Sequence, residues 1–168
     1  MMLCEVDSSV TAFIEQPLTL RYRVAGSRAR IHKPDFMVQR GAAIELIETK
    51  WEGDAASPEN EARWPVIGAA VSALGWSFEV VSERHINRQP RLDNVIALHC
   101  ARHTPMPNPE MELQLANLVR QGAVCSIDQA IKAIPTLSLR QILAMTFMGR
   151  IRLLLDEEIS GSSRILSA

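Results

Sequence analysis

The stretch His32-Lys-Pro-Asp-Phe-Met-Val-Gln-Arg-Gly-Ala-Ala-Ile-Glu-Leu-Ile-Glu-Thr-Lys50 predicts two short strands joined by a tight turn. Gly41-Ala42 suits a two-residue loop, because glycine at the first central position allows the positive φ of a type II′ turn. If the residues that flank this loop pair with each other, Asp35 lies opposite Glu48, and the Cβ atoms of directly opposed residues are about 4.5–5.5 Å apart. Two carboxylates at that distance repel each other unless a proton or a cation lies between them.

Lys50 adds an amine to this pair of carboxylates. It lies two residues beyond Glu48 and therefore projects from the same face of the strand. Two acids and a lysine that meet at one place suit a hard divalent cation beside an activated water. The alternative is an ordinary hairpin with solvated charges on one face. We favour the cation site because Pro34 is tolerated at the start of a strand and because both acids are flanked by apolar residues.

These residues resemble a known nuclease motif. Pro34-Asp35 followed by Glu48-Thr49-Lys50 matches the PD-(D/E)XK pattern. Three further segments, Glu15-Gln16-Pro17-Leu18-Thr19, His32-x-Pro-Asp-Phe and Gly75-Trp76-x-Phe, extend the match. Together they resemble the TnsA-type endonuclease subunits of heteromeric transposases over roughly residues 3–95. The C-terminal part resembles the family more loosely.

The resemblance implies a magnesium-dependent DNA endonuclease that cuts one strand at each transposon end while a partner transposase cuts the other. Asp35 and Glu48 would hold Mg²⁺, or Mn²⁺ as a substitute, and the carbonyl of Thr49 would be a further oxygen ligand. Lys50 would orient the attacking water or stabilise the developing anion. The implied partners are DNA, the partner transposase subunit and an ATPase regulator.

Two residues near the motif are further candidates for the active site. Gln16 lies at the entry to an alternating strand at 18–22, and His32 lies three residues before Asp35. For His32, the alternative is a partly exposed structural histidine.

The segment between the strand at 18–22 and the Pro-Asp pair is basic. It contains five basic residues and no acidic one, namely Arg21, Arg23, Arg28, Arg30 and Lys33. They form either a solvated hairpin face or a rim that contacts phosphates, since Lys and Arg supply sequence-independent affinity for DNA. The formal net charge of the chain is −1, so DNA binding would depend on such local patches.

The first residues predict the end of a helix whose earlier turns are not in the sequence. In the family that the chain resembles, a third catalytic carboxylate lies earlier on that helix than the position of Glu5, and nothing here matches it. We therefore expect that the start of the protein lies upstream, that the helix was lost, or that this copy is inactive. On this basis residues 1–168 alone are expected to be weakly active or inactive.

The order of elements predicts an α/β fold. It matches the restriction-endonuclease-like mixed sheet flanked by helices, the first of them truncated, that the resemblance implies. A strand at 18–22 and the Pro-Asp hairpin come first. A helix follows, with Ser57 as its N-cap, Pro58 at its first position and Gly75 just beyond its end. The strand Trp76–Val81 then returns to the sheet.

The proline-rich segment 104–109 predicts a linker, because closely spaced prolines cannot continue a helix. The expected domains are a PD-(D/E)XK nuclease-like domain at 1–103 and a C-terminal module at 110–168. Three short helices followed by a hairpin predict a winged-helix-like module. Because that module has few basic residues, docking of a protein is as well supported as reading of DNA. Residues 160–168 are expected to be mobile.

Composition sets the broad class. Hydrophobic residues make up 47% and charged residues 22% of the chain, as in an ordinary globular protein. The three cysteines have neither disulfide-framework nor zinc-site spacing. The sequence lacks a signal-peptide pattern and a long apolar run, so a cytoplasmic location is expected. Two other functions remain open: a non-catalytic DNA-binding or scaffold protein that retains the fold, and a repair or restriction nuclease of the same fold.

Overall fold

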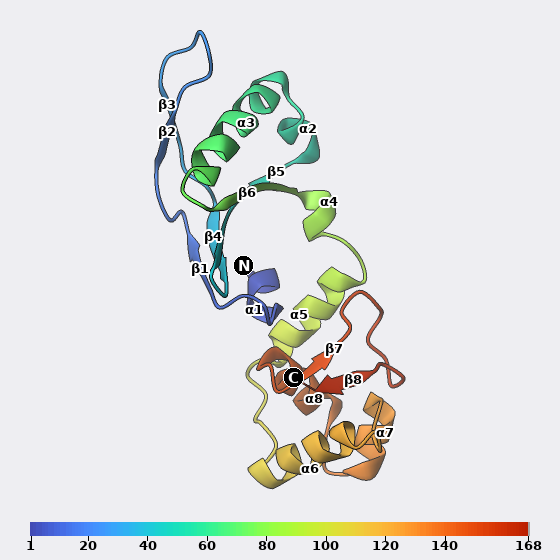
Figure 1. Cartoon of the computed structure of the whole chain (residues 1–168). Coiled ribbons are helices and arrows are strands. Elements are labelled where there is room, and N and C mark those ends of the chain that lie inside the picture. Colours follow the sequence, from blue (N-terminus) through green and yellow to red (C-terminus); the bar gives the residue numbers. More distant parts are fainter. Residues whose placement is uncertain (168) are drawn as a thin grey trace. The chain divides into compact units, whose positions relative to one another are not determined.

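A computed structural model describes residues 1–167, and the chain divides into two compact units (Figure 1). The first, here called the sheet unit, comprises Asp7–Asn87. The second, the helical unit, combines Met1–Val6 with the chain from Arg88 onward. No helix in the described part of the chain is both long and apolar enough to cross a membrane.

The sheet unit is built on a mixed four-stranded sheet, as predicted. In spatial order its strands are β1 (Ala12–Glu15), β4 (Phe36–Arg40), β5 (Ala43–Lys50) and β6 (Ser77–Ser82). The pairs β1–β4 and β4–β5 are antiparallel, and β5–β6 is parallel. The predicted strand at 18–22 is present as β2 (Leu20–Tyr22), but it pairs with β3 (Arg30–His32) in a separate two-stranded sheet. The strand that pairs with β4 at the edge of the main sheet is instead β1, which was not predicted from the sequence.

The hairpin β4–β5 has the predicted register. The opposed pairs are Phe36 with Ile47, Met37 with Leu46, Val38 with Glu45, Gln39 with Ile44 and Arg40 with Ala43. Gly41 has a φ of 59°, as the first central position of a type II′ turn requires. An L-residue there would be strained, and this requirement is why a two-residue loop at Gly41-Ala42 fixes the register of both strands.

Helix α3 (Pro58–Ser72) packs against β6 and β2 and buries one face of the main sheet. Ile67 and Val71 of this helix form a core with Leu46 of β5 and Tyr22 of β2. Side chains two residues apart on a strand share a face. The side chains that follow Leu46 at positions 48 and 50 therefore lie on the side of the sheet that α3 covers. Two short helices, α2 (Glu52–Ala55) and α4 (Glu83–Ile86), follow β5 and β6.

The helical unit has its own core. Its helices are α1 (Met2–Val6), α5 (Arg91–Ala101), α6 (Pro109–Arg120), α7 (Ile127–Ala133) and α8 (Leu139–Phe147). The strands β7 (Ile151–Leu153) and β8 (Ile165–Ser167) form an antiparallel pair. The largest fully buried side chains of this core are Leu115, Ile127, Ile142, Met145 and Ile151. The predicted caps Ser126 and Ser138 both accept a hydrogen bond from the first turn of their helices.

The predicted domain boundary at 104–109 differs from the division between the two units. That segment joins α5 to α6 inside the helical unit, whereas the chain divides after Asn87. Helix α5 belongs to the helical unit because Val95 and Leu98 are buried and α5 packs against α1 and α8. Closely spaced prolines show where a helix ends, but they do not show which hydrophobic core the preceding helix packs into.

Two further expectations differ from the structure. The short helix at the start, predicted as a remnant of the nuclease-like fold, belongs to the helical unit. Within the segment 160–168, predicted as mobile, Ile165–Ser167 is the strand β8, and Ile165 is 3% exposed. The last residue of that prediction, Ala168, lies outside the described residues.

Candidate active site

Glu48, near the end of β5, is buried, with 3% of its surface exposed. Its Oε1 lies 2.6 Å from Nζ of Lys50, and its Oε2 lies 3.3 Å from Nε2 of His32. The contact with His32 lacks the geometry of a hydrogen bond, so Oε2 and Nε2 are both buried without a hydrogen-bond partner in the described part of the chain. A buried carboxylate oxygen without a donor is unfavourable for folding. Buried groups of this kind are concentrated at sites of strain, catalysis, or water and ion binding, so Glu48 is a candidate functional residue.

Asp35 lies just before β4 and reaches across to the other strand of the hairpin. Its Oδ2 accepts hydrogen bonds from the backbone N–H of Thr49 at 2.7 Å and from the Thr49 hydroxyl at 2.6 Å. The carboxylate thus continues the pairing of β4 and β5 beyond its last backbone pair. The predicted metal ligand at Thr49 is its carbonyl oxygen, which these hydrogen bonds do not involve.

His32 connects these groups to the aromatic part of the core. Its ring lies edge-on to Trp64 and Phe78, with centroid distances of 5.9 and 6.2 Å. Burial lowers the pKa of His32 below its ordinary value of 6.5, although the negative charge of Glu48 acts in the opposite direction. The imidazole is therefore neutral at pH 7. The structure places this candidate residue in direct contact with Glu48.

Residues 7–83 match the family model described as "TnsA-like endonuclease N terminal". This segment belongs to the TnsA-like endonuclease family. The match contains Asp35, Glu48 and Lys50, and PD-(D/E)XK is the known fold of that family. It covers almost all of the sheet unit, while the helical unit from Arg88 onward lies outside it. No curated protein matches the chain.

Gln16 lies at the edge of the TnsA-like site through its backbone. Its N–H donates to the carbonyl oxygen of Asp35 at 2.8 Å, and its φ of 44° lies in the left-handed region that favours glycine. This strained residue fixes the end of β1 beside Asp35. The side chain of Gln16 is exposed, and no contact in the described residues brings it to the carboxylates.

The basic residues predicted to contact DNA all lie on β2, β3 or the connections that flank β3. All five are exposed: Arg21, Arg23, Arg28, Arg30 and Lys33. Arg30 forms an ion pair with Glu59 of α3, so its charge is already partly compensated.

Arg63 of α3 was not among the site residues predicted from the sequence. Its guanidinium carbon lies 4.1 Å from the centre of the Trp64 ring, and its Nε is buried without a hydrogen-bond partner in the described residues. Its positive charge acts on His32, where it helps to lower the pKa after the larger effects of burial and Glu48. The helix was identified from its terminal residues and its apolar spacing, and the signal that could have directed attention to position 63 is the Arg-Trp pair within it.

Two carboxylates of the candidate site, Asp35 and Glu48, are the residues that could hold a hard divalent cation. Glu48 offers the buried oxygen Oε2 that has no donor, and Asp35 offers Oδ1, since its Oδ2 is bound to Thr49. Among residues 1–167, no group of three or more acidic, histidine or cysteine side chains is arranged to hold a metal. Mg²⁺ commonly binds through one or two carboxylates and takes its remaining ligands from water and substrate phosphates. The residues present are therefore compatible with Mg²⁺.

Proposed function

We propose that this protein is a metal-dependent DNA endonuclease subunit of a heteromeric transposase, which hydrolyses a phosphodiester at transposon ends. The observation that carries the proposal is the buried Glu48, which has one carboxylate oxygen on Lys50 and the other without a donor. It occurs inside the segment that matches the TnsA-like endonuclease domain.

The chain's own residues divide the work of hydrolysis. Asp35 and Glu48 would hold Mg²⁺, which when bound lowers the pKa of its water and neutralises charge on the scissile phosphate. Lys50 would direct its Nζ to the attacking water or to a phosphate oxygen that gains charge. Arg63 would place a second positive charge near that phosphate. Because His32 is neutral, it would add no positive charge beside Glu48 that repels the metal ion.

DNA and protein partners are part of the proposal. The exposed basic residues of β2 and β3 would contact the phosphate backbone. In the helical unit, the order of three helices followed by an antiparallel strand pair supports a winged-helix-like module. Leu113 and Leu139 are 62% and 45% exposed on its helices, which favours docking of the partner transposase or an ATPase regulator there.

Nicking of a supercoiled plasmid that carries a transposon end tests this proposal. The purified chain is incubated with Mg²⁺ or Mn²⁺, with and without a partner transposase subunit. We expect a single-strand nick at the end of the element in the complete mixture, dependent on the metal and abolished by EDTA, and weak or no nicking by this chain alone. Absence of nicking in the complete mixture would contradict the proposal.

One observation favours a second candidate, a scaffold protein that retains the nuclease fold without catalysis. Among the described residues no three acidic, histidine or cysteine side chains form a metal-holding group, and Lys50 already pairs with Glu48. A calorimetric titration with Mn²⁺ separates the candidates. Saturable binding supports the nuclease, and absence of binding at millimolar Mn²⁺ supports the scaffold.

A further inference from the structure

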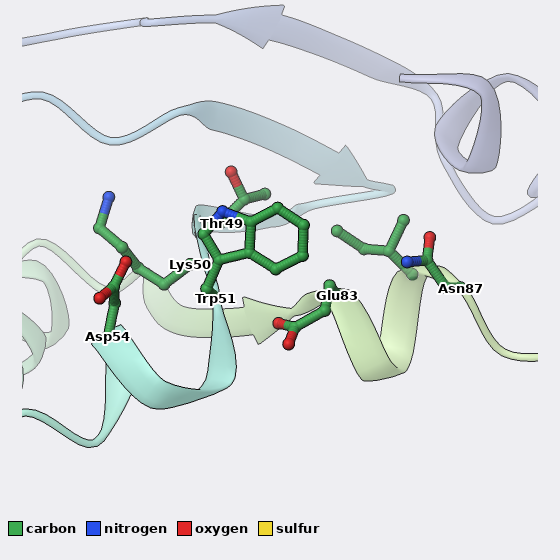
Figure 2. Close-up of a pocket in the computed structure, with 7 residues that line it drawn as sticks. Thr49, Lys50, Trp51, Asp54, Glu83 and Asn87 are labelled. Atoms are coloured by element: carbon green, nitrogen blue, oxygen red, sulfur yellow. The ribbon is translucent and has the colours of Figure 1, made fainter.

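An open pocket of about 490 Å³ lies in the sheet unit at the ends of β5 and β6 (Figure 2). Its volume falls within the range of ligand pockets, about 300–1,000 Å³. Strands β5 and β6 are parallel, and Lys50 pairs with Ser82 at their last residues. Both strands therefore end at this edge, which is where ligands bind in open α/β sheets. Lys50 lines the pocket and also contacts Glu48, so the pocket adjoins the candidate active site.

Trp51 is the most unusual residue of this pocket, because 67% of its large aromatic surface is exposed. Its backbone is well fixed, since its carbonyl accepts a hydrogen bond from the N–H of Ala55 at 2.8 Å. The next residue, Glu52, donates its N–H to the carboxylate of Glu83 at 2.8 Å. In Figure 2 the indole stands between Lys50 on one side and Asn87 on the other. The chain thus presents an aromatic face on a rigid turn without burying it in a core.

Among the described residues, the only cationic side chain that lines the pocket is Lys50, and its amine is already paired with Glu48 at 2.6 Å, so the pocket is poorly suited to a phosphate. Asp54 and Glu83 place two carboxylates in the pocket wall, and Asn87 adds an amide. Carboxylates repel an anion, but they accept hydrogen bonds from the exocyclic amine of a base, and an Asn amide pairs with adenine through two hydrogen bonds. An aromatic side chain in turn stacks on a base of any sequence.

We propose that this pocket holds a nucleobase unstacked from the DNA next to the scissile phosphate, with the base stacked on Trp51. The preferred base carries an exocyclic amine, as adenine and cytosine do. The proposal rests on the proposed nuclease function, because only a DNA strand that enters the active site brings a base to this position.

Binding measured without catalysis tests the pocket separately from the nuclease activity. The full chain in EDTA is titrated against a fluorescent ten-nucleotide deoxyadenosine strand and against an abasic strand of equal length. We expect Trp51→Ala to weaken binding of the deoxyadenosine strand about tenfold and to leave binding of the abasic strand unchanged. Trp51→Phe should keep most of the affinity, because the ring is retained.

Leu74→Ala is the matched control, since Leu74 is another exposed apolar residue of the sheet unit, 56% exposed. It should bind both strands as the unaltered protein does, and melting curves should show that every variant is folded. Equal weakening on both strands, or no effect of Trp51→Ala, would overturn the nucleobase site. Base-dependent binding without any nicking activity would support the pocket and would contradict the catalytic proposal alone.

Discussion

Glu48 in the sheet unit and Asn94 in the helical unit are both nearly completely buried, at 3% and 5% exposure, but their hydrogen bonding differs. Asn94 donates to the carbonyl oxygens of Leu155 and Glu157 at 2.8 and 2.7 Å and accepts from the N–H of Ile159 at 3.3 Å. Glu48 keeps one oxygen without a donor. A satisfied buried polar group stabilises a fold, whereas an unsatisfied one lowers stability and is retained where something must bind.

The largest effect is expected at Asp35, whose carboxylate reaches across to β5, the strand that carries Glu48. Asp35→Asn keeps an oxygen acceptor for Thr49 but removes the negative charge, so nicking of plasmid DNA should fall at least 10²-fold while the melting temperature changes little. Lys50→Ala should have a similar effect on nicking. Asp156→Asn, in the helical unit, is the control and should cut normally. Undiminished cutting by either site variant would refute the assignment of Asp35 and Lys50.

The second effect concerns Asn94, the buried polar residue whose side chain is hydrogen-bonded within the helical unit. Asn94→Ala would leave two carbonyl groups and one N–H without partners and would open a small cavity. We expect a loss of about 3 kcal/mol in the free energy of unfolding, measured by urea denaturation. Gln114→Ala, at an exposed position of α6, should change stability by less than about 0.5 kcal/mol. A loss no larger than that of the control would show that Asn94 is not a structural clamp.

A third substitution tests Glu48 itself. Glu48→Gln should weaken Mn²⁺ binding at least tenfold, because the ion loses a charged ligand. Stability should change by less than about 1 kcal/mol, since Lys50 can turn to solvent and His32 is neutral. Calorimetric titration and urea denaturation measure the two quantities. A large loss of stability with unchanged metal binding would mean that Glu48 is a structural residue, as Asn94 is, and not a metal ligand.

The smallest effect is a pH dependence at Glu45, on the opposite face of the sheet. Burial raises the pKa of Glu45 above its ordinary value of 4.5, and Glu79 raises it further. A raised pKa means that this group supports folding below pH 4.5 and loses that contribution as pH rises through its folded pKa. Glu45→Gln should therefore be about 0.5 kcal/mol more stable than the unaltered protein at pH 7 and equal to it at pH 4 or below.

Urea denaturation at both pH values measures this difference. Gln114→Ala, an exposed substitution on α6 that changes no titratable group, should alter stability equally at both pH values. If Glu45→Gln were more stable by the same amount at low pH, ionisation of Glu45 would not be what lowers the stability of the unaltered protein at pH 7.

Local chemistry made part of this structure predictable from sequence. Gly41 at the first central position of a two-residue loop determines the register of β4 and β5, and Ser126 and Ser138 mark helix starts because each side chain caps its own first turn. Such signals lie within a few residues of the structure they specify. This is why the hairpin that carries Asp35, Glu48 and Lys50 could be predicted in detail.

Features that depend on distant contacts could not be predicted in the same way. Strand β1 lacks an alternating pattern, and its position follows from pairing with β4. The division of the chain follows from where α5 is buried, through Asn94 and the loop at 155–159, more than sixty residues away. Arg63 reaches His32 only after α3 has packed on the sheet.

The hydrogen bonds from Thr49 to Asp35 give the candidate site a reporter of its own. The same carboxylate extends the pairing of β4 and β5 and is a proposed ligand of Mg²⁺, so a bound ion would draw electron density from its hydrogen bond with the Thr49 N–H. The amide proton of Thr49 should therefore shift in an NMR titration with Mg²⁺ before any DNA is added. One backbone resonance would thus follow metal occupancy independently of any cleavage assay.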